Sequence, residues 1–568
     1  EWKSAGPTRT IDSTSASQPQ PSVVEITVDM SLPAVNNSDY VVEYIIYGDG
    51  SVHVVALEFL PNSPALMNAG TELGQLSACF VLPIADSLTD IFDTLKHAAL
   101  IHQSGGGTGF SFSSIRPRGD PVKSTDGVAS GPVSFMKIFD RATEIIKQGG
   151  KRRGANMGIL SVYHPDILDF IRVKEREGVL ANFNISVSVT DDFMNRVLNN
   201  QKYEVIHPRS NKPVKEMNAR DVFDLIIMNA WQSGDPGLIF IDEINRHNPV
   251  PGAGAIEATN PCGEVPLTAF ESCNLGSINL VKICPGGKFD FKRLGEVVHT
   301  AVHFLDNVID VNKYPIPQVE KMTKANRKVG LGIMGFADCL IEMGIRYDSE
   351  EAFKAAEELI DFISREARQA SRQIAEKRGS FPNHHLSIFK DNSPMRNATV
   401  TSIAPTGSIS TIADVSSGIE PLFSVGYLRN ALDTTMLVVN PLFEKIAKER
   451  KFYSTDLIAR VVREGSIQED PHIPDDVRRI FLTAHDIKPE SHVRMQAVFQ
   501  KHVDNAVSKT INLPESATVE QLRSVFLLAH NMKCKGITVY RYGSKKVQPL
   551  EFGAIDASAF CGADLCDV

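Results

Sequence analysis

Helical stretches and short apolar segments alternate through the middle of this 568-residue chain, and this alternation constrains the fold most. Residues 77–82 form one apolar segment, and residues 398–404 form another that runs into a turn at 405–408. Residues 349–377 carry a strong helical pattern that ends at Gly379. Strands separated by helices mostly pair in parallel. The sequence therefore predicts an α/β fold with parallel strands.

Two serines are expected to begin helices. Ser87 is a favoured N-cap and is followed by apolar residues at helical spacing. Ser491 is expected to cap a helix over 492–507 in the same way. The other predicted elements are an apolar segment at 511–513, a helix over 519–532, a strand over 535–540 and a β-hairpin over 41–47 and 52–57.

Composition narrows the class of protein. Hydrophobic residues at 42% and charged residues at 22% are ordinary for a globular protein with a large core. The net charge of −9, without a Lys/Arg cluster among aromatics, argues against a nucleic-acid surface. No apolar run approaches the length of a membrane span and no secretory signal is visible, so a cytoplasmic protein without a membrane partner is expected. Its eight cysteines are then mostly reduced thiols.

The segment 260–264 brings three reactive groups together. Asn260, Cys262 and Glu264 alternate with Pro261 and Gly263, and a further thiol, Cys273, follows. Alternate side chains of an extended segment point the same way. An extended loop would therefore carry an amide, a thiol and a carboxylate into one cavity. The alternative is a surface turn with a buried structural cysteine.

Three loops are candidates for anion binding. The turn 405–410 follows a predicted strand and offers backbone N–H groups and hydroxyls, although it lacks the ending of a Walker motif. Glycine-rich loops at 105–109 and 147–154 lie near basic side chains that commonly bind phosphate. A capped helix and a solvated charged face are the alternatives for these loops.

The last cysteines, Cys561 and Cys566, lie in a polar tail with little to pack against. Two thiols without a histidine are too few for a metal site, and no metal is expected in the chain. A mobile dithiol that exchanges electrons through a disulfide fits the tail better.

Together these motifs resemble the catalytic subunit of ribonucleotide reductase, from about residue 61 to the C-terminus. The resemblance implies an α/β barrel of ten strands, built from two five-stranded parallel halves arranged antiparallel, with Cys262 on a central finger loop. It divides the chain into a catalytic barrel over 61–547 and a flexible redox tail over 548–568. Residues 1–60 are partly disordered by composition and do not resemble the helical region expected there.

The same resemblance implies catalytic roles. Cys262 would be the transient thiyl radical that takes the 3′ hydrogen of a ribonucleotide, and Glu264 would accept the 3′-hydroxyl proton. Asn260 would hydrogen-bond the substrate. Cys79 and Cys273 would be the reducing pair. Cys561 and Cys566 would re-reduce their disulfide and be reduced in turn by a thioredoxin or glutaredoxin-like partner.

The resemblance also implies two nucleotide sites and a homodimer. The ribonucleotide substrate, a di- or triphosphate, would contact Ser63, Ala78, Cys79, Gly107, Asn260, Pro261, Cys262, Gly263, Glu264, Pro405, Thr406, Gly407, Ser408 and Ile409. A deoxynucleotide effector would contact Asp86, Ser87, Arg116, Lys123, Lys147, Gln148, Lys151 and Arg152. In the family the effector site lies at a dimer interface.

The stretch 536–543 bears on how the Cys262 radical is made. Oxygen-dependent reductases pass the radical through two adjacent tyrosines here, whereas Arg541 occupies the second position in this chain. A guanidinium cannot relay a radical. The stretch, like 148–156 and 504–510, resembles the class that uses adenosylcobalamin. The alternatives are a class I large subunit with a metal-bearing partner, an inactive nucleotide-binding regulator and a thiol–metal protein.

Overall fold

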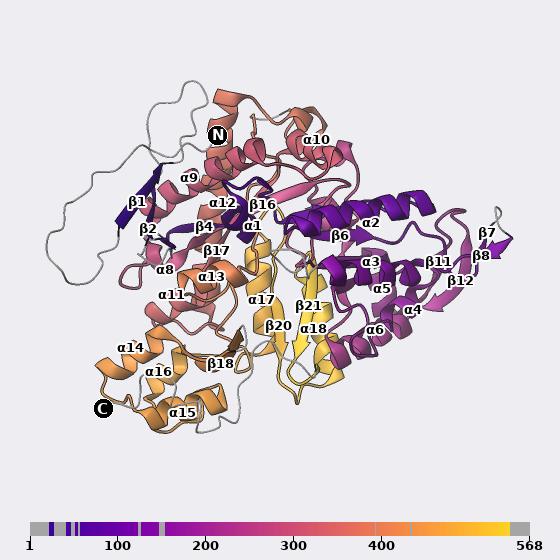
Figure 1. Cartoon of the computed structure of the whole chain (residues 1–568). Helices are drawn as coiled ribbons and strands as arrows, with labels where there is room; N and C mark the ends of the chain where they lie inside the picture. The colour runs from indigo at the N-terminus through magenta and orange to yellow at the C-terminus, as the bar shows by residue number, and fades with distance from the viewer. Residues whose placement is uncertain are drawn as a thin grey trace.

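The computed structural model describes residues 22–27, 41–46, 52–54, 57–122, 126–146, 154–391, 394–431 and 434–545 (Figure 1). The expectations for residues 1–20 and for the redox tail lie outside the described residues. So do five expected effector contacts and both tail cysteines: Lys123, Lys147, Gln148, Lys151, Arg152, Cys561 and Cys566.

Five parallel strands form the first half of a barrel. In spatial order they are β5 (Cys79–Val81), β6 (Gly107–Ser111), β9 (Asn156–Ser161), β10 (Phe183–Val189) and β13 (Gly237–Phe240). Helices connect most of these strands, as parallel pairing requires. Among them, α2 (Leu88–Gln103), α3 (Pro132–Ile146), α5 (Asp191–Leu198) and α6 (Ala219–Ser233) lie together on one side of the molecule in Figure 1.

The second half repeats the parallel arrangement. β16 (Ser272–Asn279) pairs in parallel with β17 (Val329–Met334), and β20 (Thr510–Leu513) pairs in parallel with β21 (Gly536–Arg541). The segment 399–403 joins them, because parallel bridges link Leu331 to Thr401 and Ile403 to Val507. The helices α9 (Phe291–Val311), α11 (Phe336–Glu342) and α12 (Glu350–Arg378) pack on this half.

The two halves meet in antiparallel pairs. β16 pairs antiparallel with β5 at one seam, and β13 pairs antiparallel with β21 at the other. With the bridged segment 399–403 as its tenth strand, the barrel is closed, and the predicted fold is confirmed. A short strand off this ring, β4 (Phe59–Pro61), also pairs with β16.

The predicted strand at 398–404 forms bridges rather than a regular ladder, because side chains take over part of the pairing. The amide of Asn505 donates to the carbonyl oxygen of Thr401 at 3.0 Å, and the Asp504 carboxylate accepts from the Val400 N–H at 2.8 Å. These side-chain bonds satisfy backbone groups that a neighbouring strand would otherwise satisfy.

Several predicted helices are confirmed with their caps. The Ser87 hydroxyl accepts from the Asp90 N–H at the start of α2, and α12 runs from its Ser349 cap to Gly379. The helix α18 (Val519–Asn531) and the hairpin of β2 (Val41–Ile46) with β3 (Val52–Val54), beside β1 (Ser22–Thr27), also match.

The helix expected over 492–507 is wrong at both ends. In the structure α17 (Pro489–Gln500) has Lys488 as its N-cap, and Ser491 lies inside the helix. Proline at the first helical position has a suitable φ and lacks only an N–H that would be unsatisfied anyway. The helix stops at Gln500 because the next residues join the barrel, where the Ala506 N–H donates to the Glu264 carbonyl oxygen at 2.8 Å.

Among the described residues, no helix is both long and apolar enough to cross a bilayer.

Candidate active site

The segment 260–264 is the turn of a short hairpin inside the barrel. Its strands are β14 (Ala258–Thr259) and β15 (Pro266–Leu267), which pair antiparallel. The Gly263 N–H donates to the Asn260 carbonyl oxygen at 3.1 Å, and Gly263 has a φ of +80°, which favours glycine. The extended loop expected from the sequence is therefore wrong in its local form. The side chains of Asn260 and Glu264 are buried, whereas Cys262 is exposed at the turn.

The Asn260 side chain connects the reactive groups. Its Nδ2 donates to Glu264 Oε2 at 2.8 Å and contacts Cys79 Sγ at 3.1 Å. Its Oδ1 accepts from the Val265 N–H at 2.9 Å. Asn260 and Glu264 are each only 2% exposed, so these bonds are shielded from water. The amide thus fixes the carboxylate of Glu264 near the thiol of Cys79.

Both halves of the barrel hold the finger loop. Asn184, on β10, donates its Nδ2 to the Pro261 carbonyl oxygen at 2.8 Å. From the second half, Ser402 Oγ donates to the Glu264 carbonyl oxygen at 2.9 Å, beside the bond from Ala506. Sequence reasoning did not identify Asn184 or Ser402, because each contacts the loop across a long separation in the chain.

Glycines on β6 let the finger lie against that strand. A Cβ at Gly109 would lie 1.7 Å from the Thr259 carbonyl oxygen, and one at Gly107 would lie 2.9 Å from Pro261 Cγ. The glycine-rich run was expected to bind an anion. Its glycines at 107 and 109 give the backbone of the finger room to approach. Anion binding by this run stays a prediction.

Cys79 and Cys273 are direct partners across the antiparallel seam of β5 and β16. Opposing residues in such a pair have Cα atoms about 4.5–5.5 Å apart, which is within the range that a disulfide bridges. Both side chains are buried. Burial raises the pKa of the Cys273 thiol, and Lys328 opposes that shift while Glu264 and Glu271 add to it. This spacing is compatible with the disulfide that the resemblance implies for the pair.

A buried ion pair that the sequence did not reveal lies beside these cysteines. Lys328 Nζ is 2.8 Å from Glu271 Oε2, and both side chains are 1% exposed. Burial raises the pKa of the Glu271 carboxyl, but the Lys328 charge and hydrogen bonds from Lys328, Asn326 and the Thr268 N–H outweigh it and lower that pKa. The only sequence signal was the position of Glu271, two residues before Cys273.

The other expected substrate contacts lie on elements next to the finger or at the start of short helices. Ser63 begins α1 (Ser63–Asn68), and the Ala78 N–H donates to the Cys273 carbonyl oxygen at 3.2 Å. The loop of Pro405, Thr406, Gly407, Ser408 and Ile409 leads into α13 (Gly407–Ala413). Thr406 has a φ of +54°, and its Oγ1 accepts from the Gly418 N–H at 2.7 Å, which fixes this turn.

Three expected effector residues converge at the start of α2. Arg116 Nε lies 2.9 Å from Asp86 Oδ2, and the Arg116 N–H donates to Asp86 Oδ1 at 3.1 Å. Ser87 follows Asp86 as the helix cap. Arg209, which the sequence did not suggest, lies 3.5 Å from Asp86 in the loop between β11 (Lys202–Ile206) and β12 (Pro213–Asn218).

Comparisons with known proteins show the family of the chain. The model of the family described as "Ribonucleotide reductase, barrel domain" matches residues 77–394 and 390–540. The chain belongs to the ribonucleotide reductase family. A vitamin B12-dependent ribonucleoside-diphosphate reductase of Thermoplasma acidophilum is 55% identical over 505 residues, which cover 88% of this chain and 66% of that protein. One of Mycobacterium tuberculosis is 52% identical over 499 residues, which cover 88% of this chain and 71% of that protein.

A solved ribonucleotide reductase has the same fold. The alpha subunit of the Actinobacillus ureae class Id ribonucleotide reductase superposes with a TM-score of 0.72 at 24% identity, covering 86% of this chain and 88% of that one. At this identity the likeness supports the barrel alone.

Proposed function

We propose that this ribonucleotide reductase chain reduces ribonucleoside di- or triphosphates to 2′-deoxyribonucleotides by thiyl-radical chemistry that depends on adenosylcobalamin. One observation carries the proposal: the Asn260 amide joins the Glu264 carboxylate to Cys79 Sγ at the turn that presents Cys262. The relatives named as vitamin B12-dependent reductases support the choice of reaction and cofactor.

The residues have complementary roles in this reaction. The Cys262 thiyl radical abstracts the 3′ hydrogen, and Glu264 accepts the 3′-hydroxyl proton, which assists loss of the 2′-hydroxyl as water. Cys79 and Cys273 supply two electrons and become a disulfide. The 3′ hydrogen returns from the Cys262 thiol to the product, which regenerates the radical. Asn260 keeps the Glu264 carboxylate in place throughout.

The exposure of Cys262 fits the cofactor. Of the cysteines that the structure describes, Cys262 is exposed and the others are buried. A thiol that must meet a bulky cofactor needs an open approach, and the turn provides one. When bound, adenosylcobalamin would supply the oxidising equivalent that converts this thiol to the thiyl radical.

Arg541 favours adenosylcobalamin, rather than a class I partner subunit, as the source of the Cys262 radical. The Arg541 guanidinium stacks over the Trp231 ring at 4.1 Å, and its Nε donates to the Trp231 carbonyl oxygen at 3.0 Å. A second bond runs from its Nη1 to the Glu515 carbonyl oxygen at 3.2 Å. Arg541 thus has a structural role where a class I chain would have a relay tyrosine.

Regulation and re-reduction belong to the same proposal. A deoxynucleotide effector would bind near Asp86, Ser87 and Arg116, which are close together, at the interface of a homodimer. The effector would have to compete with Asp86 for the Arg116 guanidinium. The tail dithiol of Cys561 and Cys566 would reduce the Cys79–Cys273 disulfide and would itself be reduced by a thioredoxin or glutaredoxin-like protein.

An anaerobic assay tests the proposal. The chain is incubated with each ribonucleoside di- and triphosphate, adenosylcobalamin and a small dithiol, with and without deoxynucleotide effectors and without a second protein. We expect deoxynucleotide to form in the complete mixture and no deoxynucleotide to form when adenosylcobalamin is left out. Activity that appears only on addition of a metal-bearing subunit would establish the class I alternative.

A further inference from the structure

Lys328, the residue directly before β17, lies next to Cys273 of β16. The parallel register of β16 and β17 pairs Asn274 with Val329. Extended by one residue, that register places Lys328 beside Cys273, whose other neighbour across the seam is Cys79. Laterally adjacent residues of a sheet point to the same face. The thiols of Cys79 and Cys273 and the ammonium of Lys328 therefore lie side by side on one face of the sheet.

The Lys328 side chain is held without contact to water. Its ammonium donates to Glu271 Oε2 at 2.8 Å, and Lys328 is 1% exposed. The same carboxylate accepts from the Thr268 N–H at 2.6 Å and from Asn326 Nδ2. The negative charge of the Glu271 carboxylate is therefore spread over three hydrogen bonds, from Lys328, Asn326 and the Thr268 N–H. Burial raises the pKa of the Cys273 thiol most, and the Glu264 and Glu271 charges add to that shift. The Lys328 ammonium acts against them and favours an ionised Cys273.

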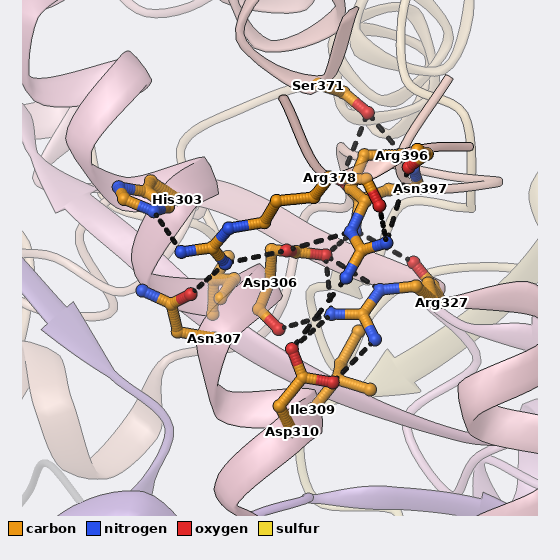
Figure 2. Close-up of polar contacts among 12 residues, drawn as sticks. His303, Asp306, Asn307, Ile309, Asp310, Arg327, Ser371, Arg378, Arg396 and Asn397 are labelled. Atoms are coloured by element: carbon orange, nitrogen blue, oxygen red, sulfur yellow. Dashed lines mark hydrogen bonds and ion pairs between the residues drawn. The ribbon is translucent and has the colours of Figure 1, made fainter. Parts of the chain in front are cut away.

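A second network fixes the residue before Lys328 (Figure 2). Arg327 Nε donates to Asp306 Oδ1 at 2.9 Å, and its Nη1 donates to Asp310 Oδ1 at 2.7 Å. Arg396 also reaches the fully buried Asp306, at 3.2 Å. Arg327 is in the left-handed region with a φ of +49°, so these bonds hold a chain bend that non-glycine residues seldom adopt. The start of β17 is thereby fixed opposite Cys273.

The environment of the two thiols differs. Both thiols are buried, but Cys79 is 3% exposed and its Sγ contacts the Asn260 amide at the finger, whereas Cys273 is 0% exposed. A dithiol that enters from the substrate side meets Cys79 first. Cys273 is then the sulfur that must leave with the electron pair, in surroundings where an anion is costly.

We propose that Lys328 is a positioning residue for re-reduction of the enzyme: its ammonium stabilises Cys273 as the departing thiolate when a dithiol attacks the Cys79–Cys273 disulfide. This inference rests on the proposed function, because it assumes that the disulfide forms at each turnover. Glu271 holds the ammonium at that position.

The exchange is balanced. A thiolate of the dithiol attacks Cys79 Sγ, the Cys79–Cys273 bond breaks, and the electron pair stays on Cys273 Sγ beside Lys328. The second thiol of the reductant loses its proton and attacks the mixed disulfide, which releases Cys79. The dithiol ends as a disulfide, and its two protons end on Cys79 and Cys273.

The rate of this exchange can be measured without nucleotide. The full chain is oxidised until Cys79 and Cys273 form a disulfide, and peptide mapping after alkylation follows the return of their thiols in dithiothreitol. Lys328→Met with Glu271→Gln removes the ion pair without leaving one charge buried alone. We expect the double variant to be re-reduced about three- to tenfold more slowly, as a leaving thiol of higher pKa requires. Lys328→Arg, which keeps the charge, should restore most of the rate.

Lys535→Met is the matched control. Lys535 is also buried, burial lowers its pKa to about 8, and its ammonium donates to the Asp504 carbonyl oxygen at 2.7 Å. Lys535 is not among the charges that shift the pKa of Cys273. Re-reduction at the parental rate is expected for this control. Equal rates for the parent and the double variant, or an equal slowing in Lys535→Met, would overturn the role of Lys328.

A single-turnover assay separates this inference from the proposed function. Pre-reduced double variant should form the same amount of deoxynucleotide per chain as the parent when no reductant is added. Loss of that product in the variant alone would assign Lys328 to substrate reduction and overturn the inference. Absence of product from the parent would refute the proposed function and leave the measured exchange rates standing.

Discussion

The described residues contain two buried cysteine pairs in very different surroundings. Cys79 and Cys273 face each other across β5 and β16, among the Asn260 amide and charged side chains. Cys284 and Cys339 are joined by a side-chain hydrogen bond and lie in the aliphatic core around α9, α11 and α12. Both pairs bring two thiols together and bury them. We propose that the first pair is the redox pair, because it also has polar partners and lies against the finger loop.

The largest difference is expected when one thiol of each pair is removed. Cys273→Ala should lower multiple-turnover activity by at least about a thousandfold, because no disulfide can form. Cys339→Ala should leave activity per folded chain unchanged and lower the free energy of unfolding by about 1–2 kcal/mol through loss of core packing. Assays with dithiothreitol and denaturant titrations measure both. Equal losses of activity would remove the distinction between the pairs.

Carboxylates near the two pairs provide the next comparison. Glu264→Gln should lower kcat by about 10²–10⁴-fold with little change in KM, as expected for loss of a general base. The hydrogen bond between the two thiols lowers the pKa of Cys284 and raises that of Cys339, and the Glu342 charge makes a minor upward contribution to each. Glu342→Gln should leave kcat unchanged. A Glu264→Gln variant with parental kcat would show that another group removes the 3′-hydroxyl proton.

The finger loop beside the Cys79–Cys273 pair needs room against β6, and glycine substitutions test this. Gly109→Ala places a methyl group against the Thr259 carbonyl and should lower the free energy of unfolding by about 3 kcal/mol. Gly295→Ala on α9 meets no atom closer than 3.6 Å and should be neutral or stabilising by up to about 1 kcal/mol. Denaturant titration of both variants measures the difference. Unchanged stability in Gly109→Ala would place the finger elsewhere.

Alkaline pH should act in the same direction on one thiol of each pair, Cys273 and Cys339, and this is the smallest effect. Burial raises the pKa of Cys273, and the hydrogen bond to Cys284 together with burial raises that of Cys339. A raised folded-state pKa stabilises the fold fully below the unfolded pKa, and that contribution is lost as pH rises above about 9. Each thiol should lower the free energy of unfolding by about 1.4 kcal/mol for each pH unit in this range. Alanine at either position should flatten this decline in denaturant titrations between pH 8 and 10; an unchanged slope would contradict the burial of that thiol.

The sequence predicted the elements of the fold whose signals are local. Ser87 and Gly379 marked helix ends by their own capping chemistry, and both are confirmed. Ser491 carried the same signal, but Pro489 and the pairing of Ala506 in the barrel decided the limits of that helix. Capping preference is weak beside proline geometry and tertiary pairing.

The candidate site was predictable where its residues lie close in sequence or in a family motif. Asn260, Glu264, Cys79 and Cys273 meet as expected, although through a tight turn rather than an extended loop. Lys328 was not predictable, since only the register of β16 and β17 brings it beside Cys273. Positions set by long-range pairing leave no local pattern in the chain.

One measurement tests most directly whether Cys262 generates a radical that the Cys79–Cys273 pair then reduces. Pre-reduced chain is given one anaerobic turnover with adenosylcobalamin and ribonucleotide, and deoxynucleotide and disulfides are then counted by peptide mapping. The parent should form deoxynucleotide together with a Cys79–Cys273 disulfide, a tail disulfide between Cys561 and Cys566, or both, while Cys284 and Cys339 stay reduced. Cys262→Ser should form neither product nor disulfide. Deoxynucleotide from Cys262→Ser, or a disulfide at Cys284–Cys339 in the parent, would contradict the account.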